Sequence, residues 1–450
     1  MIQVEPLAKQ VFEAILAQGG KVYIVGGSVR DHILGHEPTH DIDVEVFHLS
    51  YEKLCDILAG FGKVKTFGKQ FAICNLRVLP DYDFALPRKE KKNGDRHQDF
   101  EIMIDPDLPL DKAIMRRDLT MNALMYDYEN DKIIDLCHGI KDIEDNIIRV
   151  VNKDTFQEDP LRVLRVAQFA ARFKMDISQE TISLCKEMVA KGMLENLSVE
   201  RILQEYNKIL LSDKPSIGFD FLKDIHALPK YLEDLIYTPQ RLDYHPEGNV
   251  YNHTMMVVDV GATVKDQSSD PLGFMWACLL HDIGKASTTT PELHSPNHAA
   301  VGAEMLEYID LLYNKKMRRY IYELVKHHMK LVYMMERKGD VEFLLLLKEM
   351  SANAPMNDLF LITYCDKKGR GLVDEEELER LQVYRQTTME KYHDQPVPAI
   401  ITGKDLKKLN LDPLEYKRYL AFAYKKQLKG FNKEEILQTI ADEGGNYGTR

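Results

Sequence analysis

The 450-residue sequence lacks long hydrophobic runs, paired cysteine motifs and an excess of positive charge. No apolar stretch approaches the roughly 20 residues that cross a bilayer, and the N-terminal residues lack the basic-then-apolar pattern of a signal peptide. The six cysteines form no C-x-x-C pair, which is typical of unpaired thiols in a reducing compartment. We therefore expect a cytoplasmic protein. The net charge of −12 argues against indiscriminate nucleic-acid binding, although local basic patches can still bind phosphates.

The pattern of apolar residues changes near residue 150. Before it, helical and extended patterns alternate, which predicts a small mixed sheet. Strands are expected at 22–25, 41–47, 62–67, 71–78, 80–85, 100–104 and 132–135. From about residue 152 the strand signal disappears and apolar residues recur at helical spacing. The polar segment 87–99 predicts a mobile loop. Breaks in the pattern divide the chain into regions 1–150, 151–235, 236–385 and 386–450.

The most informative stretch combines a glycine turn with two carboxylates. An apolar run at 22–25 leads into Gly26-Gly27, and a helical segment follows. Glycine lets the backbone approach a ligand closely, and free N–H groups at a helix start favour phosphate. Asp41 and Asp43 are two apart in an extended pattern, so both side chains lie on one face. Two carboxylates on one face suit Mg²⁺, and a metal beside a phosphate turn indicates phosphoryl or nucleotidyl transfer.

A second motif reads Arg116-Arg117-Asp118, with Asn122 close behind it. Two arginines beside an aspartate suit a triphosphate or ribose site, because guanidinium groups bind phosphate in a bidentate manner. Asn122 could bond a sugar hydroxyl. Taken alone, the same residues are compatible with a helix start capped by Asp118.

A third motif begins a predicted helix at Glu158-Asp159-Pro160, since proline favours the first helical position. Asp159, Arg162 and Arg165 recur at a spacing that places them on nearly one face. A carboxylate and a guanidinium together can read the hydrogen-bonding edge of a base. A surface salt bridge would give the same local pattern.

The order of these motifs resembles that of the class II nucleotidyltransferases, the family of CCA-adding tRNA nucleotidyltransferases and bacterial poly(A) polymerases. The resemblance spans about residues 20–212 and rests on Gly26-Gly27-Ser28-Val29-Arg30-Asp31, Asp41-x-Asp43, Arg116-Arg117-Asp118, the connector Asp135 to Val150, Glu158-Asp159-x-x-Arg162 and Leu197-Ser198-Val199-Glu200-Arg201. It implies an α+β protein with a nucleotidyltransferase head built on a small mixed sheet (1–150). An all-α neck with templating and RNA-binding elements (151–235) would follow.

The resemblance implies a role for each matching residue. Asp41 and Asp43 would hold two Mg²⁺ ions, and Asp83 matches the position of a third carboxylate. The nucleotide site would comprise Gly26, Gly27, Arg30, Arg116, Arg117, Asp118, Asn122, Asp159, Arg162 and Arg165. The triphosphate would be gripped by Gly27, Arg30 and Arg117, and the ribose would face Asn122. The incoming base would be templated by Asp159 and Arg162, with Arg165 in support.

Two features bear on which nucleotide is added. Gln168 stands where the family often has arginine, which affects fine specificity rather than the chemistry. The segment Pro87–Asp99 resembles the flexible loop thought to help the family switch from C to A addition.

The second half carries a different set of ligand-type residues. His253, the pair His281-Asp282 and Asp366 follow the order of the HD-domain metal phosphohydrolases over about residues 240–370. Imidazole and carboxylate together form a ligand set for a divalent metal of unknown identity. His298 and His328 could hold a second ion or a substrate phosphate. The resemblance implies an HD-type helical domain (236–385) and a helical C-terminal tail (386–450), and a degenerate scaffold that positions tRNA is the alternative.

The leading hypothesis is a template-independent enzyme that adds C-C-A to tRNA from CTP and ATP, with a probable HD phosphatase or phosphodiesterase activity. A CC-adding or A-adding half enzyme or a poly(A) polymerase of the same family is the close alternative. The intact segment 87–99 counts against CC-only addition, and the acidic balance counts against a poly(A) polymerase. A nucleotide hydrolase or an RNA-binding protein with an inactive head is a further alternative.

Overall fold

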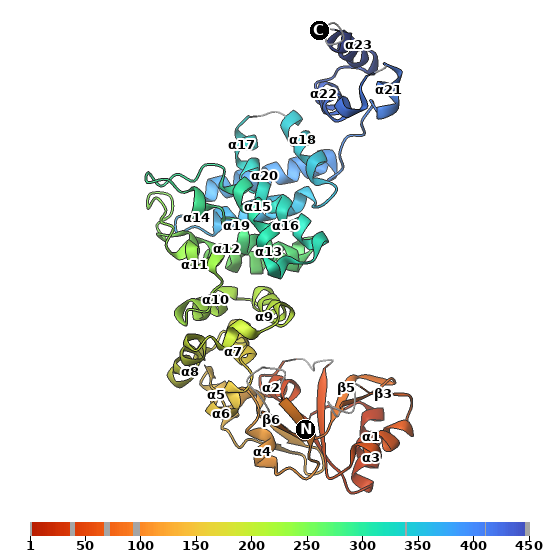
Figure 1. Ribbon diagram of the computed structural model, residues 1–450, viewed down its shortest axis with the longest axis vertical. Coiled ribbons are helices and arrows are strands. Elements are labelled where there is room, and N and C mark those ends of the chain that lie inside the picture. Colours follow the sequence, from red (N-terminus) through yellow and green to blue (C-terminus); the bar gives the residue numbers. More distant parts are fainter. Residues whose placement is uncertain are drawn as a thin grey trace. The chain divides into compact units, whose positions relative to one another are not determined.

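The structure is a computed structural model that describes residues 2–36, 41–66, 73–92, 100–337, 340–409 and 411–445 (Figure 1). Backbone contacts divide the chain into two compact units, Met1–Leu228 and Pro229–Arg450. This division falls shortly before the predicted boundary at 235, and the finer division into four regions stays a prediction.

Among the described residues, the first unit is built on a mixed sheet of seven strands. In spatial order these are β3 (Val64–Thr66), β4 (Ile73–Leu76), β5 (Leu79–Ala85), β2 (Ile42–Phe47), β1 (Lys21–Val25), β8 (Met125–Asp127) and β9 (Lys132–Ile134). The central strand β2 pairs antiparallel with β1 and parallel with β5. The parallel pairing places Asp43 directly opposite Asp83.

Strand alternation separates an apolar face of this sheet from a charged one. Val44 on β2 and Phe84 on β5 are buried, and Phe12 of α1 (Pro6–Ala17) packs edge-to-face against Tyr82 and Phe84. Because neighbouring residues in a strand point to opposite faces, Asp43 and Asp83 project away from α1. Packing of α1 on one face therefore presents the two carboxylates on the other.

The strand predictions are confirmed at all seven expected positions, and β7 (Phe100–Ile104) is one of them. The predicted mobile loop is wrong for residues 88–92, which form β6 (Arg88–Lys92) and pair antiparallel with β7. The sequence of β6 does not alternate between apolar and polar residues. This strand pairs with β7 through backbone hydrogen bonds, in a two-stranded ribbon that is separate from the main sheet. The rest of that segment, residues 93–99, lies outside the described residues. Three short strands were not predicted: β8, β10 (Ile147–Ile148) and β11 (Asp176–Ile177).

Helices complete the first unit: α2 (Gly27–Ile33), α3 (Tyr51–Ala59), α4 (Leu110–Ile114), α5 (Gly139–Glu144), α6 (Lys153–Gln157), α7 (Leu161–Phe173), α8 (Gln179–Ala190), α9 (Val199–Leu211) and α10 (Pro215–Asp224). Helix α7 lies between α9 and α10, and nearly all its residues from Leu161 to Ala171 are buried. Gly218 of α10 permits this approach, because a Cβ there would lie 2.9 Å from the Ala167 carbonyl oxygen. Ser198 caps α9 by accepting a hydrogen bond from the Arg201 N–H.

Among its described residues, the regular elements of the second unit are helices, and an isolated β-bridge joins Pro239 to Asn249. Its helices are α11 (Lys230–Ile236), α12 (Val250–Val264), α13 (Pro271–Leu280), α14 (Lys285–Thr288), α15 (His298–Met305), α16 (Lys315–His327), α17 (Lys330–Arg337), α18 (Asp340–Met350), α19 (Met356–Lys368), α20 (Glu375–Tyr392), α21 (Gly403–Lys408), α22 (Tyr416–Leu428) and α23 (Lys433–Gly445). The apolar helix α13 is buried from Gly273 to Leu280 and packs against α12, α16 and α19. No described helix is both long and apolar enough to cross a membrane. The predicted fold class is confirmed.

Candidate active sites

Three carboxylates gather on the charged face of the sheet. Asp41 precedes β2, Asp43 lies within β2, and Asp83 is its register partner on β5. One carboxylate oxygen from each lies within 4.8 Å of the other two. We call these residues the head carboxylates. Asn75 on β4 orients Asp83 by donating a hydrogen bond from Nδ2 to Asp83 Oδ1 at 3.1 Å.

The charges of the head carboxylates oppose one another. Desolvation by the surrounding protein, followed by the charge of Asp41, raises the pKa of Asp43 to about 6, although Arg117 acts in the opposite direction. A divalent cation would relieve this repulsion and restore the charged form of Asp43. The donor set of three hard carboxylate oxygens fits Mg²⁺.

A pocket of about 250 Å³ opens beside these carboxylates, and its walls carry positive charge. Its lining includes Asp43, Arg88, Arg116, Arg117 and Arg162. Arg117 also binds Glu45, with Nη2 3.1 Å from Oε2. Gly26 lies against this wall at a φ of 71°, and a Cβ there would sit 3.4 Å from Arg117 Nη1. Only glycine adopts that conformation readily and keeps the arginine in place.

Four of the predicted nucleotide-binding residues bind one another in the structure. Arg30 is only 4% exposed and donates from Nη1 to Asn122 Oδ1 at 2.7 Å. Asn122 in turn donates to Asp118 Oδ1 at 3.2 Å, and Arg165 Nε donates to Asp118 Oδ2 at 2.6 Å. Burial alone would raise the pKa of Asp118, but Arg165 and these hydrogen bonds hold it below its ordinary value.

Arg30 is enclosed further by apolar and charged neighbours. Its guanidinium carbon lies 5.3 Å and 4.7 Å from the ring centres of Phe169 and Phe173, and Nη2 pairs with Asp31 Oδ1 at 2.7 Å. This arrangement ties α2 to α7. A direct contact between Arg30 and a triphosphate therefore stays a prediction.

The side chains of the predicted base-reading residues Asp159 and Arg162 bind other groups, while their backbones are joined by a hydrogen bond from the Arg162 N–H to the Asp159 carbonyl oxygen at 3.0 Å. Asp159 Oδ1 accepts a hydrogen bond from the Leu161 N–H, and Asp159 Oδ2 binds Arg201 Nη2 at 2.7 Å. Arg162 donates to the carbonyl oxygen of Arg116 at 2.9 Å, which holds it against the pocket wall. The sequence analysis assigned no role to Arg201, because nothing in local spacing pairs it with a residue 42 positions earlier. Gln168 is buried within α7.

In the second unit, all six predicted ligand residues come together from five helical segments. We call His253, His281, Asp282, His298, His328 and Asp366 the HD cluster. His253 Nε2 lies 3.1 Å from Asp366 Oδ1 and 3.4 Å from His281 Nε2. On the other side, His298 Nε2 lies 3.4 Å from both His328 Nε2 and Asp282 Oδ1. Gly284 allows this second group to form, because a Cβ there would lie 2.1 Å from the His298 carbonyl oxygen.

The hydrogen bonds of the imidazole rings fit a metal site. Each Nδ1 faces a backbone carbonyl oxygen: His281 faces Cys278 at 2.9 Å, His298 faces Ser295 at 2.8 Å, His328 faces Val325 at 2.7 Å and His253 faces Gly369 at 3.1 Å. A carbonyl only accepts, so each Nδ1 carries a proton, and a ring in its neutral form then has its lone pair on Nε2. The four Nε2 atoms converge within the HD cluster.

The carboxylates of the HD cluster support the same assignment. Among the described residues, both Asp282 oxygens and Asp366 Oδ2 are buried without a hydrogen-bond donor. Lys285 Nζ forms an ion pair with Asp282 Oδ2 at 2.7 Å and also donates a hydrogen bond to Gln240 Oε1 at 2.9 Å, and Arg370 Nη2 lies 3.6 Å from Asp366 Oδ2. Buried acceptors without donors are costly unless a cation binds them. The residues therefore fit a divalent metal.

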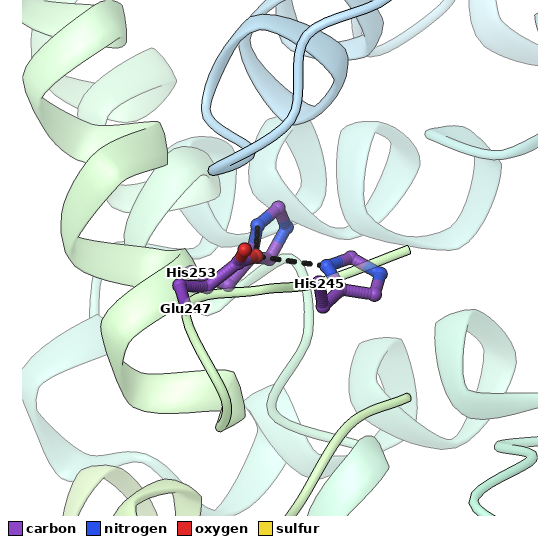
Figure 2. Close-up of side chains that lie close together, drawn as sticks. All are labelled: His245, Glu247 and His253. Carbon is purple, nitrogen blue, oxygen red and sulfur yellow. Dashed lines mark hydrogen bonds and ion pairs between the residues drawn. The ribbon is translucent and has the colours of Figure 1, made fainter. Parts of the chain in front are cut away.

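The carboxylate of Glu247 lies beside the ring of His253, a predicted metal ligand (Figure 2). Glu247 Oε1 lies 3.2 Å from His253 Nδ1 and 2.8 Å from His245 Nδ1, and the Gly371 N–H donates to its other oxygen at 3.1 Å. Burial alone would raise the pKa of Glu247, but hydrogen bonds from His253, His245 and the backbone lower it to about 2. The sequence analysis missed His245 and Glu247, because the pattern of residues 236–250 indicated only a loop between helices.

The fold and the two sites define a nucleotidyltransferase head joined to an HD-type helical unit. Three family models match the chain: the poly A polymerase head domain over residues 22–149, the probable RNA and SrmB-binding site of polymerase A over 174–236, and the HD domain over 250–366. These matches agree with the α+β head and helical remainder that the structure describes.

Individual relatives specify the family further. The multifunctional CCA protein of Acinetobacter baylyi is 34% identical over 401 residues, which cover 86% of this chain and 94% of the relative. A CCA-adding enzyme solved with CTP has a TM-score of 0.64 at 20% identity, and one solved with ATP has 0.63 at 20%. Both alignments cover 98% of this chain and 96% of the solved one, and they support the fold. The chain belongs to the class II tRNA nucleotidyltransferase and poly(A) polymerase family, among the multifunctional CCA proteins.

The contact between Glu247 and His253 generates a first prediction. Glu247→Gln should weaken divalent-metal binding by the HD cluster about 10–100-fold, because a neutral amide orients the ring less firmly and makes Nε2 less basic. Mn²⁺ binding is followed through the free-ion paramagnetic resonance signal, in a background carrying Asp41→Asn and Asp43→Asn. Asp243→Asn, an exposed change in the same segment, is the control. Equal affinities for the two variants would contradict the assigned role.

Proposed function

We propose that this chain adds C, C and A to the 3′ end of tRNA, using CTP and ATP. The observation that carries the proposal is the group of head carboxylates beside an arginine-lined pocket. The name of the Acinetobacter relative and the two structural neighbours solved with CTP and ATP support it. tRNA as substrate agrees with the cytoplasmic location that the composition predicts.

The proposed chemistry is the attack of the tRNA 3′-hydroxyl on the α-phosphate of the nucleotide, with release of pyrophosphate. Mg²⁺ held by Asp41, Asp43 and Asp83 would make the hydroxyl a better nucleophile and stabilise charge on the α-phosphate. Arg116 and Arg117 line the pocket and are placed to bind the phosphates, which keeps the leaving pyrophosphate paired as the bond breaks.

Base selection is proposed to reside at the start of α7. Arg162 lines the pocket, and Asp159 lies in the turn just before that helix. A carboxylate acceptor and a guanidinium donor match the amino and ring-nitrogen edges of C and A, and reject bases that leave these groups unpaired. We propose that Arg30, Asp118, Asn122 and Arg165 brace this wall through their mutual hydrogen bonds.

For the second unit, we propose hydrolysis of a phosphoester, such as a 2′,3′-cyclic or terminal phosphate. The buried acceptors of Asp282 and Asp366 and the converging imidazoles carry this proposal. A divalent metal held there would activate water and polarise the phosphoryl oxygen. Water adds across one P–O bond, and the freed oxygen leaves with a proton.

Loss of the head carboxylates tests the transferase proposal. Asp41→Asn with Asp43→Asn should reduce incorporation of labelled CTP and ATP into tRNA lacking its 3′ end by about 10³-fold or more, because no anionic ligand remains on β2. Asp56→Asn, on the exposed side of α3, is the matched control. Unchanged incorporation by the double variant would contradict the proposal.

The length of the product separates the close alternatives in the same assay. Addition that stops after C-C-A supports the proposal. Products that end at C-C, a single A on a C-C end, or a long A tract would each identify a different member of the family instead.

A change in the HD cluster should have the opposite effect on the two activities. His281→Ala should abolish metal-dependent hydrolysis of a cyclic phosphodiester, since it removes an inward-facing Nε2, while CCA addition stays within about twofold of the unaltered protein. The double head variant should retain that hydrolysis. Loss of both activities in either variant, with an unchanged melting temperature, would rule out two separate centres.

A further inference from the structure

A third group of ligand-type side chains lies outside both proposed reaction centres. Glu323 and His327 are one turn apart on α16, and Glu349 comes from α18. His327 Nε2 lies 3.3 Å from Glu323 Oε2 and 3.4 Å from Glu349 Oε1. His327 is adjacent in sequence to His328 of the HD cluster, but successive residues of a helix point about 100° apart. His328 Nε2 faces His298, whereas His327 Nε2 faces α18.

These buried atoms have no hydrogen-bond partner among the described residues. His327 is fully buried, and neither of its ring nitrogens makes a hydrogen bond. The Oε2 atom of Glu323 is also buried without a donor. Leaving such groups unpaired costs about 1–3 kcal/mol each. A fully buried imidazole directed at two carboxylate oxygens is therefore a site that a cation would stabilise.

The two separations from His327 Nε2 match those of a metal coordination shell. Bonds of about 2.0–2.2 Å in tetrahedral geometry place neighbouring ligand atoms roughly 3.3–3.6 Å apart. The observed separations of 3.3 and 3.4 Å are in that range, and they resemble the 3.4 Å separations within the HD cluster. Hydrogen bonds between the same atoms would be shorter, about 2.7–3.0 Å.

We propose that Glu323, His327 and Glu349 form a binding site for a divalent transition metal, with Zn²⁺ as its ion. One imidazole and two carboxylates are ligands that Zn²⁺ accepts. Asn353 donates a hydrogen bond from Nδ2 to Glu323 Oε1 at 3.0 Å. This bond orients the carboxylate so that its other oxygen, Oε2, faces the site. The side chain of Glu349 is 44% exposed, so the site has a route to solvent and room for a water ligand.

Two lysines also contact the carboxylate from α18. Lys326 Nζ lies 2.7 Å from Glu349 Oε1, and Lys330 Nζ lies 3.8 Å from Oε2. A bound cation must displace or tolerate these charges. The Lys326 side chain is 31% exposed, so its ammonium group would turn into solvent when the ion binds. The metal would join α16 to α18 and replace the lysine pairing.

The direct test counts Zn²⁺ ions bound by the full chain after equilibrium dialysis, by inductively coupled plasma mass spectrometry. Glu349→Gln should bind one Zn²⁺ fewer per chain than the unaltered protein. Glu342→Gln, an exposed change on the same helix, should bind the same number. An unchanged Zn²⁺ count for Glu349→Gln would overturn the proposal.

A second variant separates a metal site from an ion-pair network. Lys326→Gln should raise the Zn²⁺ affinity of the site by about tenfold, because it removes a competing charge beside Glu349. If the cluster only holds a protonated His327 between carboxylates, Lys326→Gln gains no Zn²⁺ affinity and the proposal fails. This readout applies even if Glu349→Gln destabilises the fold. Hydrolysis by the HD cluster should be unchanged in both variants, which places the ion outside that centre.

Discussion

Both proposed centres depend on one constraint. Apolar packing of helices and strands holds side chains with metal-ligand atoms close together. Helix α13 is buried along most of its length, and its C-terminal end carries His281 and Asp282 into the interior. Both residues are buried, and α13 packs against α12, α16 and α19. The hydrophobic surface buried by the helix therefore opposes the cost of placing imidazoles and carboxylates in contact. A divalent cation removes that cost, so folding and metal binding should be coupled.

In the head, the pairing of strands brings the carboxylates together. The parallel pairing of β2 with β5 brings Asp43 opposite Asp83, and buried Val44 and Phe84 prevent a slip by one residue, which would turn both carboxylates toward α1. Desolvation, followed by the charge of Asp41, raises the pKa of Asp43 to about 6. In the HD cluster, burial alone would raise the pKa of Asp282, but His281 and Lys285 hold it well below its ordinary value.

The sequence predicted the helices and strands whose apolar pattern lies within a short stretch of residues. Alternation at Val44 and Val46 identified β2, and helical spacing identified the second half of the chain. β6 carries charged residues throughout, so nothing in its sequence distinguished a strand from a loop. The family resemblance placed Arg30 at the triphosphate, yet its surroundings include Phe169, which lies far along the chain. A tertiary contact has no fixed spacing in the sequence. The pairing of Asp159 with Arg201 and the contact of Glu247 with His253 were therefore not predicted.

The second partner of each imidazole distinguishes the HD cluster from the Glu323, His327 and Glu349 site. In the HD cluster every histidine has its Nδ1 held by a carbonyl, and His253 also has Glu247 behind it, so the rings are oriented before a metal arrives. His327 has no partner for Nδ1 among the described residues, and its ring is held by packing alone. Pre-orientation by a second partner contributes about 10–100-fold to metal affinity. The Glu323, His327 and Glu349 site should therefore bind its ion more weakly than the HD cluster and lose it first on dialysis against a chelator. The order of release follows from these hydrogen bonds, because both sites offer imidazole nitrogens and carboxylate oxygens.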